Sequence, residues 1–320
     1  MTKKEIVYPD ADAGTEEQID SGLRLDLELV GNFKLYSDAP ENNEIFIERI
    51  RNAHAIVLGW NLPNEVMLEA KELEIISFTG IGVQKFVDMQ SARERGITVC
   101  NSPGYGDNAV AEHALALLLS SAKNICGYDK DLKNGLWRSE ERSIELCGKT
   151  IGLVGFGGIA QAFSRMVAAL GMRVIVWTRS KSKYQHLFPN VEFVGFDALL
   201  ERSDVLSVHI AHTPQTENLI SRDVLDRLKP GALFINTARG EVVDEDALVE
   251  VLTDGRIAAA GLDVFHTEPL GPSNKLTLLD NVVLTPHIAF STPEASQRLT
   301  RIALKNVVDF YSSKPINIVN

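Results

Sequence analysis

The stretch TIGLVGFGGIA, residues 150–160, joins a run of apolar residues to a glycine-rich turn. Gly155, Gly157 and Ala160 fit the pattern G-x-G-x-x-G/A, which is weak evidence when it stands alone. Its context strengthens it, because a strand-like run precedes the turn, apolar residues at helical spacing follow it, and the strand-like run RVIVW (173–177) comes next. A strand, a glycine turn and a helix in this order gather backbone N–H groups and the positive end of a helix dipole around a pyrophosphate. We therefore predict a dinucleotide site, against the alternative of a glycine turn without a ligand.

The composition limits the classes of protein to which the chain can belong. Its 320 residues, 45% of them hydrophobic, can bury a large core and are enough for two domains. The formal net charge of -11 argues against nucleic-acid and membrane-surface partners, because those anionic partners would repel the protein. Cys100, Cys126 and Cys147 have neither CxxC nor His-interleaved spacing, so we predict no disulfide framework and no metal site. Without a signal-like or membrane-spanning apolar run, the chain is expected to be cytoplasmic.

Short apolar runs alternate with helix-length amphipathic segments, which is typical of βαβ units around parallel sheets. We predict one set of strands at 5–9, 33–37, 55–60, 73–78 and 97–101, and a second set at 150–156, 173–177, 191–195, 205–210, 232–237, 258–265 and 282–286. Two long helical patterns remain, at 107–125 and 292–313. The expected fold class is therefore α/β, with doubly wound parallel sheets.

Three strands of the second set run out to ionisable residues, Arg239, Glu268 and His287. Ligands of open parallel sheets bind at the carboxyl ends of the strands, so these side chains should converge. Arg239 can hold a carboxylate and its neighbouring ketone with a planar fork of N–H donors. His287 can donate a proton near neutral pH, and Glu268 can orient its imidazole and stabilise the imidazolium. This chemistry fits the reduction of a 2-oxo acid by a nicotinamide cofactor.

Four segments carry a resemblance to a known family: IGLVGFGGIAQ (151–161), NTARGEVVDEDAL (236–248), GLDVFHTEPL (261–270) and LTPHIAFST (284–292). They make the chain resemble the D-isomer-specific 2-hydroxyacid dehydrogenases, in particular the glyoxylate and hydroxypyruvate reductase-like members. The resemblance implies two Rossmann-like domains, a discontinuous substrate-binding domain at 1–100 plus 289–320 and a dinucleotide-binding domain at 101–288. It also implies a homodimer formed through the dinucleotide-binding domain, and a small 2-oxo or 2-hydroxy acid as substrate.

The resemblance also implies roles for individual residues. Arg239, Glu268 and His287 fall on catalytic positions, and Ile81 and Gly82 match the backbone segment that receives the substrate carboxylate together with Arg239. We expect contacts with the cofactor from Val110, Gly155, Gly157, Gly158, Ile159, His209, Thr216, Ala238, Asp263 and His287. The chain departs from the family pattern at residues 209–213, where HIAHT replaces HxPLT and adds His212. It also departs at His266 and Phe290, which could shape the substrate pocket.

The stretch TRSK, residues 178–181, addresses the choice of cofactor. An Asp or Glu normally ends the second strand of such a domain and accepts hydrogen bonds from the ribose hydroxyls of NAD. Thr178 stands there instead, followed by Arg179, Ser180 and Lys181, which can bind a 2'-phosphate through hydrogen bonds and charge. The alternative is a solvated basic loop. We predict a preference for NADP(H), with NAD(H) possible, and hence reduction of the 2-oxo acid.

Two other functions compete with this one. A cofactor-sensing interaction protein of the corepressor kind could keep the glycine turn, but it would not need Arg239, Glu268 and His287 together. Oxidation of formate is disfavoured, because it releases carbon dioxide and leaves no alkoxide for a histidine to protonate.

Overall fold

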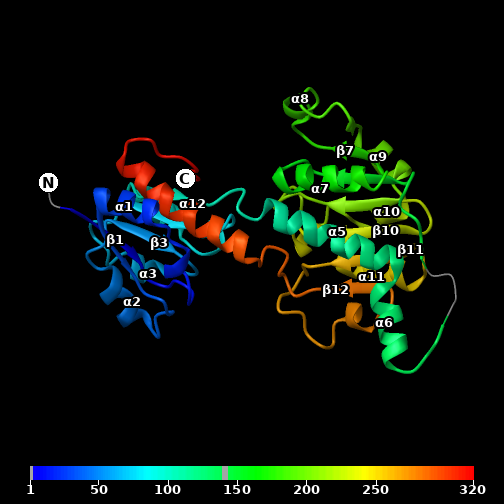
Figure 1. Cartoon of the computed structure of the whole chain (residues 1–320), viewed down its shortest axis with the longest axis horizontal. Coiled ribbons are helices and arrows are strands. Elements are labelled where there is room, and N and C mark those ends of the chain that lie inside the picture. The colour runs from blue at the N-terminus through cyan, green and yellow to red at the C-terminus, as the bar shows by residue number, and fades with distance from the viewer. Residues whose placement is uncertain (1–2, 139–142) are drawn as a thin grey trace. The chain divides into compact units, whose positions relative to one another are not determined.

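The computed structural model describes residues 3–138 and 143–320, which divide into two compact units (Figure 1). The first unit comprises Met1–Gly106 and Thr292–Asn320, and the second comprises Asp107–Ser291. The assignment of substrate binding to 1–100 plus 289–320, and of dinucleotide binding to 101–288, stays a prediction.

The first unit contains a five-stranded parallel sheet in the order β2-β1-β3-β4-β5. Its strands are β1 (Lys4–Tyr8), β2 (Gly31–Leu35), β3 (Ala55–Leu58), β4 (Ile75–Phe78) and β5 (Thr98–Cys100). Its helices are η1 (Glu16–Gln18), α1 (Ser21–Val30), α2 (Asn43–Ile50), α3 (Asn64–Met67), η2 (Val83–Lys85), α4 (Met89–Glu94) and the last helix, α12 (Pro293–Tyr311). Figure 1 shows α12, in red and orange, beside α1, in blue. The amide of Asn306 on α12 donates to Ser77 on β4 (3.1 Å), which ties the chain's end into this unit.

The second unit contains a seven-stranded parallel sheet in the order β12-β11-β10-β9-β6-β7-β8. Its strands are β6 (Thr150–Val154), β7 (Arg173–Trp177), β8 (Glu192–Phe193), β9 (Val205–Val208), β10 (Ala232–Asn236), β11 (Ile257–Leu262) and β12 (Val282–Leu284). Its helices are α5 (Asp107–Lys123), α6 (Ile125–Lys133), α7 (Gly158–Ala169), α8 (Lys181–Tyr184), α9 (Phe196–Arg202), α10 (Arg222–Asp226), η3 (Gly240–Val242), α11 (Glu245–Thr253) and η4 (Lys275–Leu278).

Two apolar clusters form the core of the second unit. One unites buried residues of α5 and α7 with the sheet, and the other unites those of α9, α10 and α11 with it. The order of the strands reverses between β6 and β9, which is where doubly wound sheets bind their ligands. Both sheets are parallel and covered by helices, so the predicted fold class is confirmed.

The elements differ from the sequence prediction mainly at their ends. The helix predicted at 107–125 is two helices, because Asn124 adopts a left-handed backbone conformation (φ +49°) between α5 and α6. The strand predicted at 258–265 ends at Leu262, because the backbone then turns to place the carboxylate of Asp263 against the loop after β12. In the described residues, no helix is both long and apolar enough to span a membrane.

Candidate active site

The glycine turn follows β6 and leads directly into α7. Gly155 has a φ of +98°, and a Cβ atom there would lie 2.5 Å from the carbonyl oxygen of His209, so this position requires glycine. A Cβ atom on Gly157 would meet no atom within 4 Å, which leaves open space above the turn. α7 begins at Gly158, and its first backbone N–H groups, including that of Ile159, have no partner within the helix. An open turn at a helix N-terminus fits a pyrophosphate.

A cavity of about 270 Å³ lies beside this turn. It is lined by Gly155, Phe156, Trp177, Thr178, Arg179, Ser180, His209, Ile210, Ala211, Thr213, Gln215, Thr216 and Leu219. The cavity therefore gathers three of the four residues expected to choose the cofactor. The fourth, Lys181, begins α8 and does not line the cavity. The hydroxyl of Thr178 accepts a hydrogen bond from the backbone N–H of Ser180 (3.3 Å), which holds the turn after β7.

His209 and Thr216 hold the loop on the far side of the cavity. The Nε2 atom of His209 lies 2.9 Å from the Ser207 hydroxyl, and its ring packs 5.4 Å from that of Phe163. Burial lowers the pKa of His209 to about 4, so its imidazole is neutral near pH 7. The hydroxyl of Thr216 donates to the carbonyl oxygen of Ala211 (2.8 Å), which braces the loop where the sequence departs from the family pattern.

Asn236 positions the turn that carries Arg239. Its side-chain oxygen accepts a hydrogen bond from the N–H of Ala238, and its amide donates to the carbonyl oxygen of Arg239, both at 2.9 Å. Asn236 is buried, so these bonds define the shape of the turn. A Cβ atom on Gly240 would lie 1.9 Å from the carbonyl carbon of Phe265. Only glycine therefore lets the Arg239 turn pack so closely on the loop that leads to Glu268.

Glu268 and His287 form a direct pair. The Oε2 atom of Glu268 lies 2.7 Å from Nδ1 of His287, and its Oε1 atom accepts a hydrogen bond from the N–H of Phe265 (3.0 Å). Both side chains are about one third exposed. With Nδ1 engaged, Nε2 is the ring atom available to exchange a proton with a substrate.

The backbone of His287 is held in a left-handed conformation, with φ +52°. This conformation costs a residue with a side chain about 1–2 kcal/mol. The compensation comes from Asp263, which is fully buried: its carbonyl oxygen accepts the N–H of His287 (2.8 Å), and its carboxylate accepts those of Ile288 (3.0 Å) and Ala289 (2.9 Å). Asp263 thus shapes the turn that carries His287.

The remaining predicted residues lie on three elements. Ala238 belongs to the Arg239 turn, and Val110 is buried on α5, a helix that packs against β10, β11 and β12. Ile81 and Gly82 belong to the first unit, in the loop between β4 and η2. The side chain of Ile81 is 47% exposed, and its carbonyl oxygen accepts a hydrogen bond from the Asn101 amide (3.1 Å).

Sequence reasoning missed three residues of this site: Asn236, His113 and Thr285. Asn236 stands at the end of a predicted strand, where a buried side-chain amide indicates a turn that is fixed by hydrogen bonds to its backbone. His113 lies on α5, where its Nε2 atom is 2.9 Å from the hydroxyl of Thr285. Among the residues that the structure describes, no group of three or more His, Cys, Asp or Glu could hold a metal ion.

Comparisons with known proteins show which family the chain resembles. Residues 115–289 match the family model for the D-isomer specific 2-hydroxyacid dehydrogenase, NAD binding domain. The chain is 35% identical over 319 residues to a glyoxylate reductase of Thermococcus litoralis, covering 96% of this chain and 95% of that one. It is 40% identical over 283 residues to a D-3-phosphoglycerate dehydrogenase of Archaeoglobus fulgidus, covering 87% of this chain but only about half (54%) of that longer protein. Among solved structures, an acyclic imino acid reductase (Bsp5) in complex with NADPH and D-Arg superposes with a TM-score of 0.84 at 30% identity, covering 99% and 100% of the two chains.

Proposed function

This chain belongs to the D-isomer-specific 2-hydroxyacid dehydrogenase family of oxidoreductases, and from that premise we propose that it reduces a small 2-oxo acid, of the glyoxylate or hydroxypyruvate kind, to the D-2-hydroxy acid with NADPH. The observation that carries the proposal is the pair of Glu268 and His287, joined at 2.7 Å on the turns that follow β11 and β12. The glyoxylate reductase of Thermococcus litoralis supports this choice of substrate class.

Each of the three proposed catalytic side chains has its own role. Arg239 binds the carboxylate of the 2-oxo acid through its guanidinium fork and orients the ketone. The nicotinamide, when bound, supplies the hydride. His287 donates its Nε2 proton to the oxygen of the ketone as that oxygen becomes negative. The carboxylate of Glu268 stabilises the imidazolium before the transfer and fixes its orientation, while Ile81 and Gly82 are proposed to offer backbone N–H groups to the substrate carboxylate.

The residues around the 270 Å³ cavity support NADPH over NADH. Thr178 supplies no carboxylate to repel a 2'-phosphate, and Arg179 beside it can pair with that phosphate in a charge-assisted hydrogen bond. Ser180 adds a hydroxyl, and Lys181 adds charge at the start of α8. The acyclic imino acid reductase of similar structure was solved with NADPH. Gly157, Gly158 and Ile159 would hold the pyrophosphate, with Val110, Ala238 and His287 toward the nicotinamide; Asp263, predicted as a cofactor contact, is fully buried and would act through the turn that carries His287.

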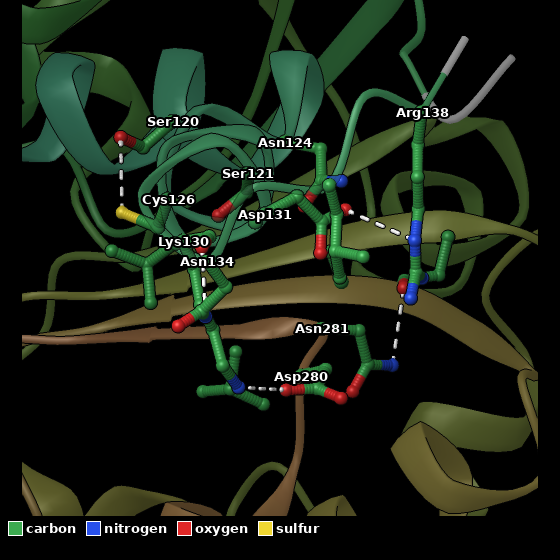
Figure 2. A pocket seen from close by; sticks show the side chains of 16 residues that line it. Ser120, Ser121, Asn124, Cys126, Lys130, Asp131, Asn134, Arg138, Asp280 and Asn281 are labelled. Carbon is green, nitrogen blue, oxygen red and sulfur yellow. Dashed lines mark hydrogen bonds and ion pairs between the residues drawn. The ribbon is translucent and has the colours of Figure 1, made fainter. Parts of the chain in front are cut away.

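The surface around α6 supports a homodimer formed through the second unit. Four large apolar side chains are exposed there, those of Ile125 (53%), Leu132 (58%), Leu136 (43%) and Trp137 (88%). A cavity of about 510 Å³ opens beside them (Figure 2), between α6 and the residues that begin β11 and β12. Ion pairs of Lys130 with Asp280 (2.9 Å) and of Arg138 with Asp131 (3.7 Å) line it. We propose that a second copy of the chain covers these apolar side chains.

Steady-state kinetics test the proposed activity. Glyoxylate, hydroxypyruvate and larger 2-oxo acids are offered to the purified protein with NADPH and, separately, with NADH. The proposal expects oxidation of NADPH with at least one small 2-oxo acid and formation of the D-enantiomer. Binding of NADPH without turnover of any acid would instead favour a cofactor-sensing protein.

A further inference from the structure

A chain of hydrogen bonds connects α5 to the turn that carries His287. The Nε2 atom of His113 lies 2.9 Å from the Thr285 hydroxyl oxygen, and that hydroxyl lies 2.6 Å from Oδ1 of Asp263. The same carboxylate accepts the backbone N–H groups of Ile288 and Ala289. His113, Thr285 and Asp263 therefore form a continuous network that ends on the residues adjoining His287.

The protons that each group carries determine which group donates in each of these hydrogen bonds. Asp263 is buried, and its carboxylate offers only acceptors, so the single proton of the Thr285 hydroxyl points toward it. The oxygen of Thr285 must then accept from His113, which requires a proton on Nε2 of that imidazole. Nε2 of His113 also lies 3.5 Å from Oδ1 of Asp263, so the imidazole, the hydroxyl and the carboxylate form one compact cluster.

The network acts on a strained element. His287 has a φ of +52°, a conformation that persists only where the surroundings over-determine it. Asp263 is the group that holds this turn, and His113 and Thr285 hold one oxygen of Asp263. A loosened carboxylate would let the turn relax and would draw the His287 imidazole away from Glu268.

We infer that His113 and Thr285 are positioning residues: acting through Asp263, they hold His287 in the orientation in which it meets Glu268 and donates its proton. In this inference neither His113 nor Thr285 contacts the substrate. The catalytic part of this inference rests on the proposed function, in which His287 protonates the reduced ketone.

Paired variants distinguish a positioning role of His113 and Thr285 from an effect on folding stability alone. Thr285→Val keeps the shape of the side chain and removes the hydroxyl, whereas Thr285→Ser keeps the hydroxyl. His113→Leu removes the donor, whereas His113→Gln offers an amide in its place. Thr253→Val and His186→Leu are matched controls, because both side chains are exposed on the second unit, away from this network. NADPH affinity and the melting temperature are measured for every variant.

The kinetic expectation is a loss in kcat without a matching rise in KM. A displacement of a reacting group by about 1 Å can cost up to about 100-fold in rate, so we expect kcat for hydroxypyruvate reduction to fall about tenfold or more in Thr285→Val and His113→Leu. Thr285→Ser and His113→Gln should recover most of the rate, and the double variant should lose no more than the worse single variant. Unchanged kcat in both apolar variants, or losses that multiply in the double variant, would overturn the inference.

A second readout needs no turnover. The ring N–H proton of His287 that faces Glu268 should give a downfield NMR signal, identified by its absence in His287→Asn. That signal should shift or broaden in Thr285→Val and stay in place in Thr285→Ser. If it is unaffected by Thr285→Val, the positioning role is wrong even where the enzyme is active. If the signal responds but no 2-oxo acid is reduced, the network stands and the proposed function fails.

Discussion

The Nδ1 atom of His287 lies 2.7 Å from Oε2 of Glu268, although 18 residues separate them in the sequence, and the N–H of Phe265 holds the other oxygen of the same carboxylate. A histidine held in this way keeps its second nitrogen outside the pair and has a negative partner for its charged form. The proposed proton transfer depends on this pair.

Glu268→Gln should reduce kcat for 2-oxo acid reduction by about 100-fold or more, because an amide keeps the shape but no longer stabilises the imidazolium. The KM for the substrate should change little, since the proposed contact with the acid is made by Arg239. Glu250→Gln is the matched control, as Glu250 pairs with Arg222 on the surface (2.6 Å). A Glu268→Gln variant as active as this control would show that the carboxylate is dispensable.

Thr178→Asp should reverse the preference for cofactor. A carboxylate at this position accepts hydrogen bonds from ribose hydroxyls and repels a 2'-phosphate, so the ratio of kcat/KM for NADPH to that for NADH should fall at least about tenfold, which corresponds to about 1.4 kcal/mol. Thr253→Asp, on the exposed side of α11, controls for the added charge. Equal use of both cofactors by the unmodified protein would contradict the role given to Thr178 and Arg179.

Gly240→Ala should destabilise the second unit and impair substrate binding, because the new Cβ atom would lie 1.9 Å from the carbonyl carbon of Phe265. Overpacking of this kind costs about 1–3 kcal/mol and should lower the melting temperature. The KM for the 2-oxo acid should also rise as the Arg239 turn moves. Gly195→Ala makes the same change where a Cβ atom meets nothing within 4 Å, so it should cost much less stability, through the N-cap of α9 alone.

The stability of the protein should fall as the pH is lowered from about 6.5 to about 4, in part because of His209. Burial lowers its pKa to about 4 from the ordinary value of 6.5, so in this range the unfolded chain binds a proton that the folded chain excludes. One such proton contributes a slope of about 1.4 kcal/mol per pH unit. Urea unfolding at several pH values should show a shallower slope for His209→Gln than for the unmodified protein. His186→Gln, at an exposed histidine, is the control; if His209→Gln has the same slope as the unmodified protein, His209 is not held neutral in the folded chain.

Much of the second unit could be predicted because its signals are local. The order of strand, glycine turn and helix places Gly155 and Gly157, and the end of the next strand places Thr178 about 20 residues later. Parallel strands bring their carboxyl ends to one edge of a sheet, so the meeting of Glu268 with His287 (2.7 Å) could also be expected, whereas the place of Arg239 beside them stays a prediction.

The supporting residues could not be predicted in the same way. Asn236 and Asp263 act through bonds to backbone groups of turns whose conformations, such as the positive φ of His287, have no signature in the sequence. His113 looked like one polar residue in an apolar helix, and only tertiary packing places it against Thr285, 172 residues away. The ends of α5 and β11 also differ from the prediction, because the left-handed backbone of Asn124 ends α5 and the tertiary hydrogen bonds of Asp263 end β11.

The central claim is that His287 donates the proton in an NADPH-dependent reduction of a small 2-oxo acid, and His287→Asn tests it most directly. Asn removes the proton that can be donated near neutral pH but remains compatible with the left-handed conformation at this position. Steady-state reduction of glyoxylate and hydroxypyruvate is compared with NADPH affinity in the same preparation. We predict that kcat falls by about 100-fold or more while NADPH still binds normally. Intact turnover in a variant that binds NADPH normally would contradict the assignment.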